Sequence, residues 1–196
     1  PPTDWNLAWA CLPGWDVLTL ESMITTRRGD GGETDLLFGR RVAKTDARIE
    51  AVGACDELMS ALGLARAASA YAVRQEAIRA IQKDLIMIMG QIAGAPAGDE
   101  ASKHRVPNLA PERLTWLDAG VATLEKSQPP VTDWVLPGAN QESAALDFSR
   151  TAARRAERVV LALDPEIAGG PMAIYLNRVS DYLWLLAREV ERETAG

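Results

Sequence analysis

The chain has 196 residues and a formal net charge of -6 at pH 7, with 47% hydrophobic and 24% charged residues. This balance is typical of one globular domain and excludes an intrinsically disordered chain. The negative charge argues against nucleic acid as the main partner, so any anion site must be local. No apolar run is long enough to cross a bilayer, and two cysteines, Cys11 and Cys55, are too few for a disulfide framework. We expect reduced thiols, a cytoplasmic location and neither a membrane nor a nucleic-acid partner.

The first 22 residues contain three tryptophans around Pro13 and Gly14 without a clear period. The chain opens on proline, and Met23 stands just before a glycine-rich segment. We therefore expect residues 1–22 to be an N-terminal extension and residues 23–196 to form a single domain. On this hypothesis the natural product begins at Met23.

Residues 25–34 read TTRRGDGGET, with three glycines and two adjacent arginines but no apolar residue. Glycines let backbone N–H groups approach an anion, and Arg27 and Arg28 can share charge with phosphate oxygens. The spacing matches neither the Walker A motif nor the Rossmann fingerprint. The segment is therefore either a solvated turn or a phosphate-binding loop.

From residue 46 onward the apolar spacing is helical, and no run has the period of a strand. The first helix opens behind Thr45 and Asp46 as candidate caps, and the second follows the ladder 78–92 and ends at 94–98. Residues 98–111 form a loop, and a third helix runs from Pro111 to the prolines at 129 and 130. Residues 134–140 make an extended approach and a turn, a fourth helix covers about 141–163, and the last begins near Pro171. The sequence predicts an all-α five-helix bundle.

The fourth helix carries four arginines in nine residues, with Arg150, Arg154 and Glu157 on one face beside Arg155 and Arg158. This is either a solvated face, with Arg154 paired to Glu157, or a polyanion clamp. On the last helix Asn177, Asp181, Trp184 and Arg188 form a polar stripe next to the apolar one. Asp56 and Glu57 of the first helix are either ordinary surface acids or partners of the arginines.

The only histidine, His104, lies in the polar loop, so a histidine-based triad or a His-rich metal site is not expected, and no residue is assigned to a metal. A reaction at these residues would depend on positioning and electrostatics rather than on a protein nucleophile.

Four segments together resemble the ATP:cob(I)alamin adenosyltransferases of the propanediol-utilisation (PduO-like) type. These segments are TTRRGDGGET with Lys44 in RRVAKTD, EAVGACDELMSALG, WVLPG with ALDFSRTAARRAER, and YLNRVSDYLWLLAR. They occur in the family's order and cover most of residues 25–188. The resemblance implies a homotrimer of five-helix bundles with ATP and the corrinoid bound between neighbouring subunits.

By this resemblance one subunit would bind ATP through Thr25, Thr26, Arg27, Arg28, Gly29, Thr34, Asp35 and Lys44. The neighbouring subunit would contribute Arg154, Arg155, Glu157, Arg158 and Asn177. Asp56 would pair with Arg150 across the interface, and these two residues with Arg154 are the predicted catalytic set. Trp134 and Trp184 would line the corrinoid.

The implied reaction transfers the 5′-deoxyadenosyl group of ATP to Co(I), with Mg²⁺ and basic side chains neutralising the triphosphate. A corrinoid reductase and a B12-dependent enzyme are candidate partners. The chain departs from the family pattern at Arg28, Asp35, Ala139 and Trp134, which stand where threonine, serine, glycine and phenylalanine are common. We expect slower turnover rather than loss of activity. The alternatives are a corrinoid or nucleotide carrier without transfer activity, and a bundle that scaffolds partners.

Overall fold

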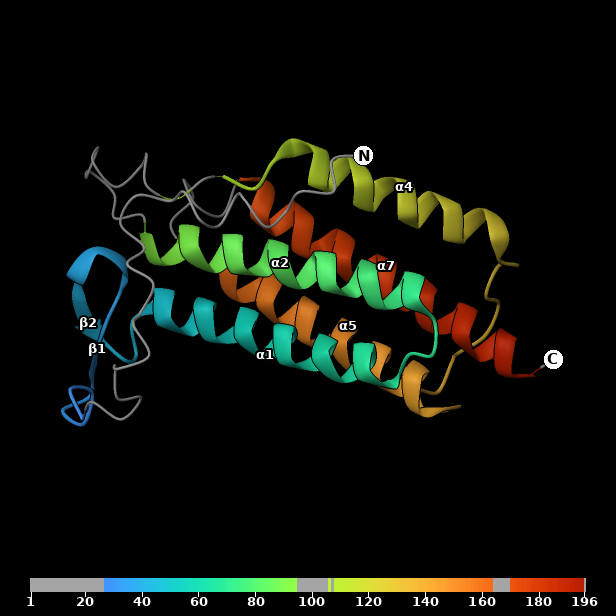
Figure 1. Cartoon of the computed structure of the whole chain (residues 1–196), viewed down its shortest axis with the longest axis horizontal. Coiled ribbons are helices and arrows are strands. Elements are labelled where there is room, and N and C mark those ends of the chain that lie inside the picture. The colour runs from blue at the N-terminus through green and yellow to red at the C-terminus, as the bar shows by residue number, and fades with distance from the viewer. Residues whose placement is uncertain (1–26, 95–105, 107, 164–169, 196) are drawn as a thin grey trace.

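The computed structural model describes residues 27–94, 106, 108–163 and 170–195. In these residues five long helices form a bundle, and a small β-hairpin lies at one end of it (Figure 1). The predicted five-helix fold is confirmed. In chain order the elements are β1 (Glu33–Asp35), the 3-10 turn η1 (Leu37–Gly39), β2 (Arg41–Ala43), α1 (Ala47–Ala68), α2 (Ala72–Gly94), α4 (Pro111–Ser127), α5 (Gln141–Leu161) and α7 (Pro171–Ala195).

The helices begin where the sequence provides caps. The Asp46 carboxylate accepts a hydrogen bond from the Arg48 amide at 2.9 Å and caps α1, as predicted. Asn140 and Ser143 form a reciprocal capping box at the start of α5, and Pro111 occupies the first turn of α4. The fourth helix ends at Leu161, slightly before the predicted residue 163, because the next residues close a turn onto Val159 and Val160.

The core contains much of the predicted apolar stripes, but it also includes Leu58, which the predicted stripe of α1 left out. The ladder on α2 is fully buried, and so are Cys55 and Leu62 of α1 and Leu176, Val179 and Leu183 of α7. Each aliphatic side chain buried in this way contributes roughly 1.5–3 kcal/mol of transfer free energy. α1 packs between α2 and α5, whereas α7 packs between α5 and α4. Cys55 is a free thiol, as expected; Cys11 lies outside the described residues.

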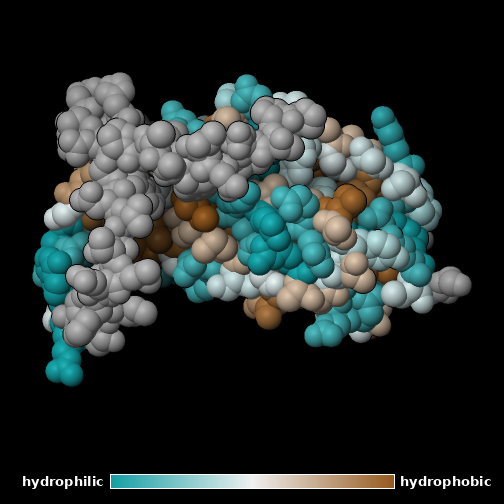
Figure 2. Space-filling model, in the orientation of Figure 1, coloured by the Kyte–Doolittle hydropathy of each residue, from teal (hydrophilic) through white to brown (hydrophobic). Residues whose placement is uncertain are grey.

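Sequence reasoning missed the β-hairpin. β1 and β2 pair antiparallel with Thr34 opposite Val42, and each strand has only three residues, too few to display an alternating pattern. Leu36 is buried and its amide donates to the Arg40 carbonyl at 2.7 Å, which anchors the hairpin tip. Much of the hairpin surface is hydrophilic (Figure 2), although Phe38 at its tip is exposed. Among the described helices none is both long enough and apolar enough to cross a membrane.

Candidate functional site

The glycine-rich segment forms the turn that leads into β1. Backbone hydrogen bonds close it, from the Asp30 amide to the Arg27 carbonyl at 3.3 Å and from the Gly32 amide to the Gly29 carbonyl at 3.2 Å. Arg27 has a φ of 56° and Gly32 one of 84°, both in the left-handed region. A turn with left-handed residues can direct its remaining free amides toward one side, and such an arrangement binds anions in other proteins. Thr25 and Thr26 lie outside the described residues.

Lys44 lies across this turn. Its amide donates to the Gly32 carbonyl at 2.9 Å. A Cβ placed on Gly29 would lie only 3.1 Å from the Lys44 ammonium nitrogen. The lysine therefore occupies the space that the missing side chain of Gly29 leaves. The structure brings the predicted residues Gly29 and Lys44 together, although they are distant in the sequence.

Two of the departures from the family pattern contact each other. The Arg28 guanidinium lies 3.4 Å from the carboxylate of Asp35. Arg41 contacts the same carboxylate at 3.5 Å, donates to Glu33 at 3.0 Å and also donates to the Arg28 carbonyl. The pair is exposed, so its ionic interaction contributes little to stability. Its effect is to hold the Arg28 side chain along the hairpin.

The arginines of α5 have different environments. Arg155 reaches α1, where it lies 2.8 Å from Glu50 and 3.4 Å from Glu57. Arg154 and Arg158 are exposed and have no ion pair within the described part of the chain. They stand one helical turn apart and so present two uncompensated positive charges on one face. A polyanion is the ligand that such a face attracts.

The interpretation of Arg154 as the partner of Glu157 is wrong. Glu157 instead accepts a hydrogen bond from the side-chain amide of Asn177 on α7, at 3.0 Å. This contact joins α5 and α7 beside the arginines, and the Arg154 guanidinium has no ion pair among the residues that the structure describes. The predicted residues Glu157 and Asn177 are therefore neighbours. Asp181, on the same stripe of α7, pairs with Arg178 at 3.0 Å.

The predicted pair Asp56 and Arg150 is not joined within one chain. Asp56 is exposed on α1, and it has no ion pair among the described residues. Arg150 donates through Nε to Asp147 of its own helix at 3.1 Å. Asp56 lines a shallow groove of about 600 Å³ between α1 and α5, together with Ser60, Leu64, Phe148, Thr151 and Arg155.

Sequence reasoning overlooked Asp147. Its carboxylate is almost completely buried and accepts hydrogen bonds from Arg150 and from Arg188 of α7. The signal in the sequence is the i, i+3 spacing of Asp147 and Arg150. Such pairs are common on exposed helix faces, so the spacing alone does not indicate a buried carboxylate. Arg188, which the sequence places in a polar stripe, is buried.

The two predicted corrinoid residues lie apart. Trp134 is 96% exposed in the segment between α4 and α5, and the Asn140 side chain ties this segment to Thr194 near the end of α7. Trp184 is half-buried in the middle of α7, 5.6 Å from the guanidinium carbon of Arg188. The hairpin lies at the other end of the bundle from the segment that joins α4 to α5 (Figure 1). One chain alone therefore does not gather all the predicted residues.

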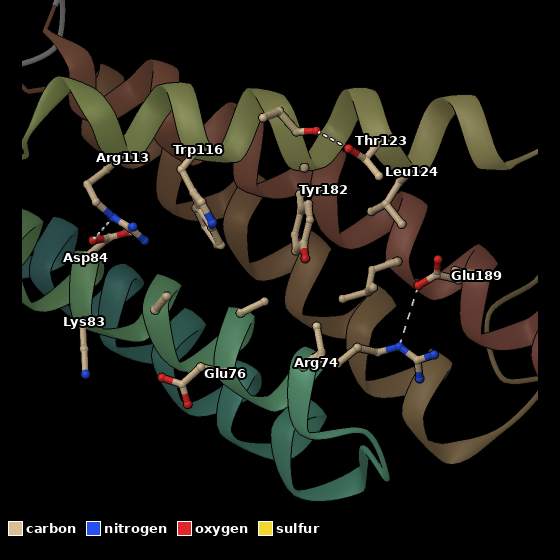
Figure 3. Close-up of a pocket in the computed structure, with 16 residues that line it drawn as sticks. Arg74, Glu76, Lys83, Asp84, Arg113, Trp116, Thr123, Leu124, Tyr182 and Glu189 are labelled. Atoms are coloured by element: carbon tan, nitrogen blue, oxygen red, sulfur yellow. Dashed lines mark hydrogen bonds and ion pairs between the residues drawn. The ribbon is translucent and has the colours of Figure 1, made fainter. Parts of the chain in front are cut away.

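A larger hollow, of about 770 Å³, lies between α2, α4 and α7 (Figure 3). Arg113 spans its rim to Asp84 with hydrogen bonds of 2.8–2.9 Å and stacks on Trp116. Tyr182 and Leu186 form part of its apolar lining. None of the described residues that the sequence predicted for the site lines this hollow.

Comparison with known proteins places these features in one family. The sequence model of that family, described as cobalamin adenosyltransferase, matches residues 24–190. The corrinoid adenosyltransferase PduO of Citrobacter freundii is 36% identical over 171 residues, which are 87% of this chain and 50% of the relative. The chain thus spans about half the length of this relative and of its Salmonella typhimurium counterpart. The corrinoid adenosyltransferase of Mycobacterium leprae is 37% identical, covering 84% of this chain and 89% of the relative.

Solved structures agree with this assignment. A variant PduO-type ATP:corrinoid adenosyltransferase from Lactobacillus reuteri, complexed with cobalamin and ATP, superposes with a TM-score of 0.79 at 30% identity. The superposed region covers 88% of this chain and 96% of the Lactobacillus reuteri chain. A second variant from the same organism, complexed with ATP, gives a TM-score of 0.78 at 29% identity. The chain belongs to the cobalamin adenosyltransferase family.

Proposed function

We propose that the protein transfers the 5′-deoxyadenosyl group of ATP to cob(I)alamin or a related corrinoid. The observation that carries the proposal is the exposed pair Arg154 and Arg158, which has no acidic partner in the described chain. Two unpaired arginines one turn apart fit a triphosphate, and the solved relatives bind ATP and cobalamin. The turn at Gly29 with Lys44 provides a second set of donors for the same anion.

The chemistry requires no nucleophile from the protein. The Co(I) centre attacks C5′ of ATP with its own electron pair, the C5′–O bond breaks, and triphosphate leaves with that bond's electrons. The protein orients the two substrates and stabilises the negative charge that develops on the leaving group. Arg154, Arg158 and Lys44 supply positive charge for this step.

Mg²⁺ is expected to accompany ATP. The ion prefers six oxygen ligands, and phosphates with water satisfy most of its coordination sphere. Glu157 is the carboxylate that lies among the α5 arginines, and its hydrogen bond to Asn177 occupies only one of its oxygens. It is the residue we assign to hold the ion or one of its water ligands.

The active site is proposed to form between subunits of a homotrimer. Asp56 is exposed and lines the groove between α1 and α5. Of the three side-chain nitrogens of Arg150, only Nε has a partner among the described residues. A neighbouring copy that seats here would bring its Asp56 to Arg150 and close a cross-subunit ion pair. Trp134 and Trp184 would then line the corrinoid and disfavour an axial ligand on cobalt.

The direct test is a single-turnover absorbance experiment with ATP and chemically reduced cobalamin. Transfer converts Co(I) into a Co–C bonded product with a different spectrum. Loss of Arg154 in Arg154→Ala removes charge-assisted hydrogen bonds of about 1.5–3 kcal/mol, so we expect a roughly ten- to hundred-fold lower kcat/KM for ATP. Arg79→Ala, which removes an exposed arginine of α2, serves as the matched control.

If Arg154→Ala works as well as the parent protein, the assignment of the phosphate clamp is wrong. Measurable ATP binding without any spectral conversion in the parent protein favours the alternative, a carrier that binds corrinoid and nucleotide. The Arg28 and Asp35 pair is the feature that favours this alternative, because it holds Arg28 away from a free role in phosphate binding.

A further inference from the structure

The buried carboxylate of Asp147 connects two parts of the proposed site. Oδ1 accepts from Nε of Arg150 at 3.1 Å, and Oδ2 accepts from the Arg188 guanidinium at 2.5 Å. The Asp147 side chain is only 3% exposed, whereas that of Arg150 is 26% exposed. The Arg150 side chain therefore runs from a buried anchor to a partly exposed position on α5.

The second branch of this cluster leads to an aromatic residue. The Arg188 guanidinium also contacts Glu191 at 2.8 Å, and its central carbon lies 5.6 Å from the centre of the Trp184 ring. Because Arg188 is held by two carboxylates, it has little freedom to rotate away from this ring. The Arg188 guanidinium is thereby held beside the Trp184 ring.

The charges in this cluster balance. Asp147 and Glu191 carry two negative charges, and Arg150 and Arg188 carry two positive charges. Replacing the Asp147 carboxylate with a neutral amide removes the negative charge and leaves one acceptor oxygen for two arginines, so an N–H donor faces either Arg150 or Arg188. One guanidinium loses its acceptor and has to shift, and both arginines lose the negative charge that neutralises them.

We propose that Asp147 is a positioning residue that couples the subunit contact made by Arg150 to the corrinoid wall formed by Trp184. The inference rests on the proposed function for the roles of these two residues. It goes beyond that function because Asp147 itself touches neither substrate. Its carboxylate acts through Arg150 on α5 and through Arg188 on α7.

The test compares Asp147→Asn with the parent protein in two readouts that do not depend on activity. The tryptophan emission of each protein, minus that of its Trp184→Phe version, isolates the signal of Trp184. We expect Asp147→Asn to change this signal and its quenching by acrylamide. Sedimentation velocity is expected to reveal weaker assembly, because Arg150 loses its anchor.

Kinetics provide the third readout. We expect Asp147→Asn to raise the KM for chemically reduced cobalamin roughly ten-fold, while the KM for ATP changes less than about two-fold. The matched control is Asp84→Asn, which disrupts a similarly buried carboxylate–arginine contact between α2 and α4. It is expected to lower the Tm without changing the Trp184 signal or the ratio of the two KM values.

Either an unchanged Trp184 signal or unchanged sedimentation in Asp147→Asn overturns the coupling. A parent protein without transfer activity contradicts the proposed function, yet the emission and sedimentation results still decide the role of Asp147. If Asp147→Asn does not fold, Arg188→Lys takes its place, because it keeps the charge and loses the planar group beside Trp184. It must then reproduce the change in Trp184 emission, or the inference is wrong.

Discussion

At the scale of single residues, two of the four departures from the family pattern contact each other. Arg28 and Asp35 looked like two separate changes in a phosphate loop, but their side chains pair across the hairpin. Asp35 also meets Arg41, which in turn holds the Arg28 carbonyl. The loop thus keeps an organised backbone while the charge of Arg28 is partly neutralised. Lys44, which has no such acidic partner among the described residues, is the better placed cation for phosphate.

Gly29→Ala is expected to displace Lys44 and weaken ATP use. The new Cβ would meet the ammonium at 3.1 Å, and the flexible lysine side chain can move away without unfolding the turn. We therefore expect a several-fold higher KM for ATP, corresponding to about 1 kcal/mol, with no change in Tm. Gly31→Ala is the control, since a Cβ there meets nothing within 4 Å. Equal kinetics for the two variants would contradict the role assigned to Lys44.

At the scale of elements, the helices divide their faces between packing and function. α5 buries Leu146, Ala153, Ala156 and Val160, turns Arg155 toward α1 and leaves Arg154 exposed. α7 contributes Asn177 to this face, where it contacts Glu157. On its other side α7 contacts α2 through Tyr175. The Tyr175 hydroxyl donates to Asp84, which Arg113 of α4 also contacts. One buried carboxylate therefore joins three helices.

This junction predicts a loss of stability at high pH. Burial raises the pKa of the Tyr175 hydroxyl well above its ordinary 10.0, and the negative charge of Asp84 raises it further. Above about pH 10 the unfolded chain releases this proton and the folded chain retains it, so the free energy of unfolding falls as pH rises. Tyr175→Phe should remove up to about 1.4 kcal/mol per pH unit of that slope.

Urea unfolding of both proteins between about pH 8 and pH 11 measures the difference in slope. Tyr182 and Cys55 also have raised pKa values, mainly because of burial, but they are present in both proteins and cancel in the comparison. Parallel pH profiles for the parent and the variant would show that Tyr175 does not hold its proton in the fold.

At the scale of the whole molecule, one chain carries the parts of the site at separate places. The hairpin lies at one end of the bundle, and the segment between α4 and α5, which contains Trp134, lies at the other (Figure 1). α5, with 21 residues rising about 1.5 Å each, spans roughly 30 Å between these ends. Substrates that contact both sets of residues need a second copy, which is the physical argument for a site between subunits.

Asp56→Ala is expected to weaken assembly and slow transfer together. The variant removes the carboxylate that is proposed to meet Arg150 of a neighbouring copy, whose guanidinium then stays partly unpaired at the interface. Sedimentation velocity measures the association of the subunits, and single-turnover kinetics measure the rate of transfer. We expect the association constant and the rate constant each to fall about ten-fold. Glu76→Ala, an exposed acid on α2, should change neither. A variant that sediments and reacts like the parent excludes the cross-subunit pair.

The sequence by itself determined the helices and the residue types of the site. The caps at Asp46 and Asn140 and the apolar ladder on α2 are local patterns, because helix formation depends on neighbours three and four positions apart. The glycines and basic residues of the loop also indicate a candidate anion site. No local rule fixes which charges end up paired.

Only the tertiary structure decided those pairings. In the fold, Glu157 contacts Asn177 rather than Arg154, and Arg28 pairs with Asp35. Asp147 is buried between Arg150 and Arg188. Asp147 and Arg188 are 41 positions apart in the chain, and the packing of α5 on α7 brings them together. A charged side chain is neutralised or left free by whichever group the fold brings within a few ångströms, so its role depends on distant residues rather than on its own helix.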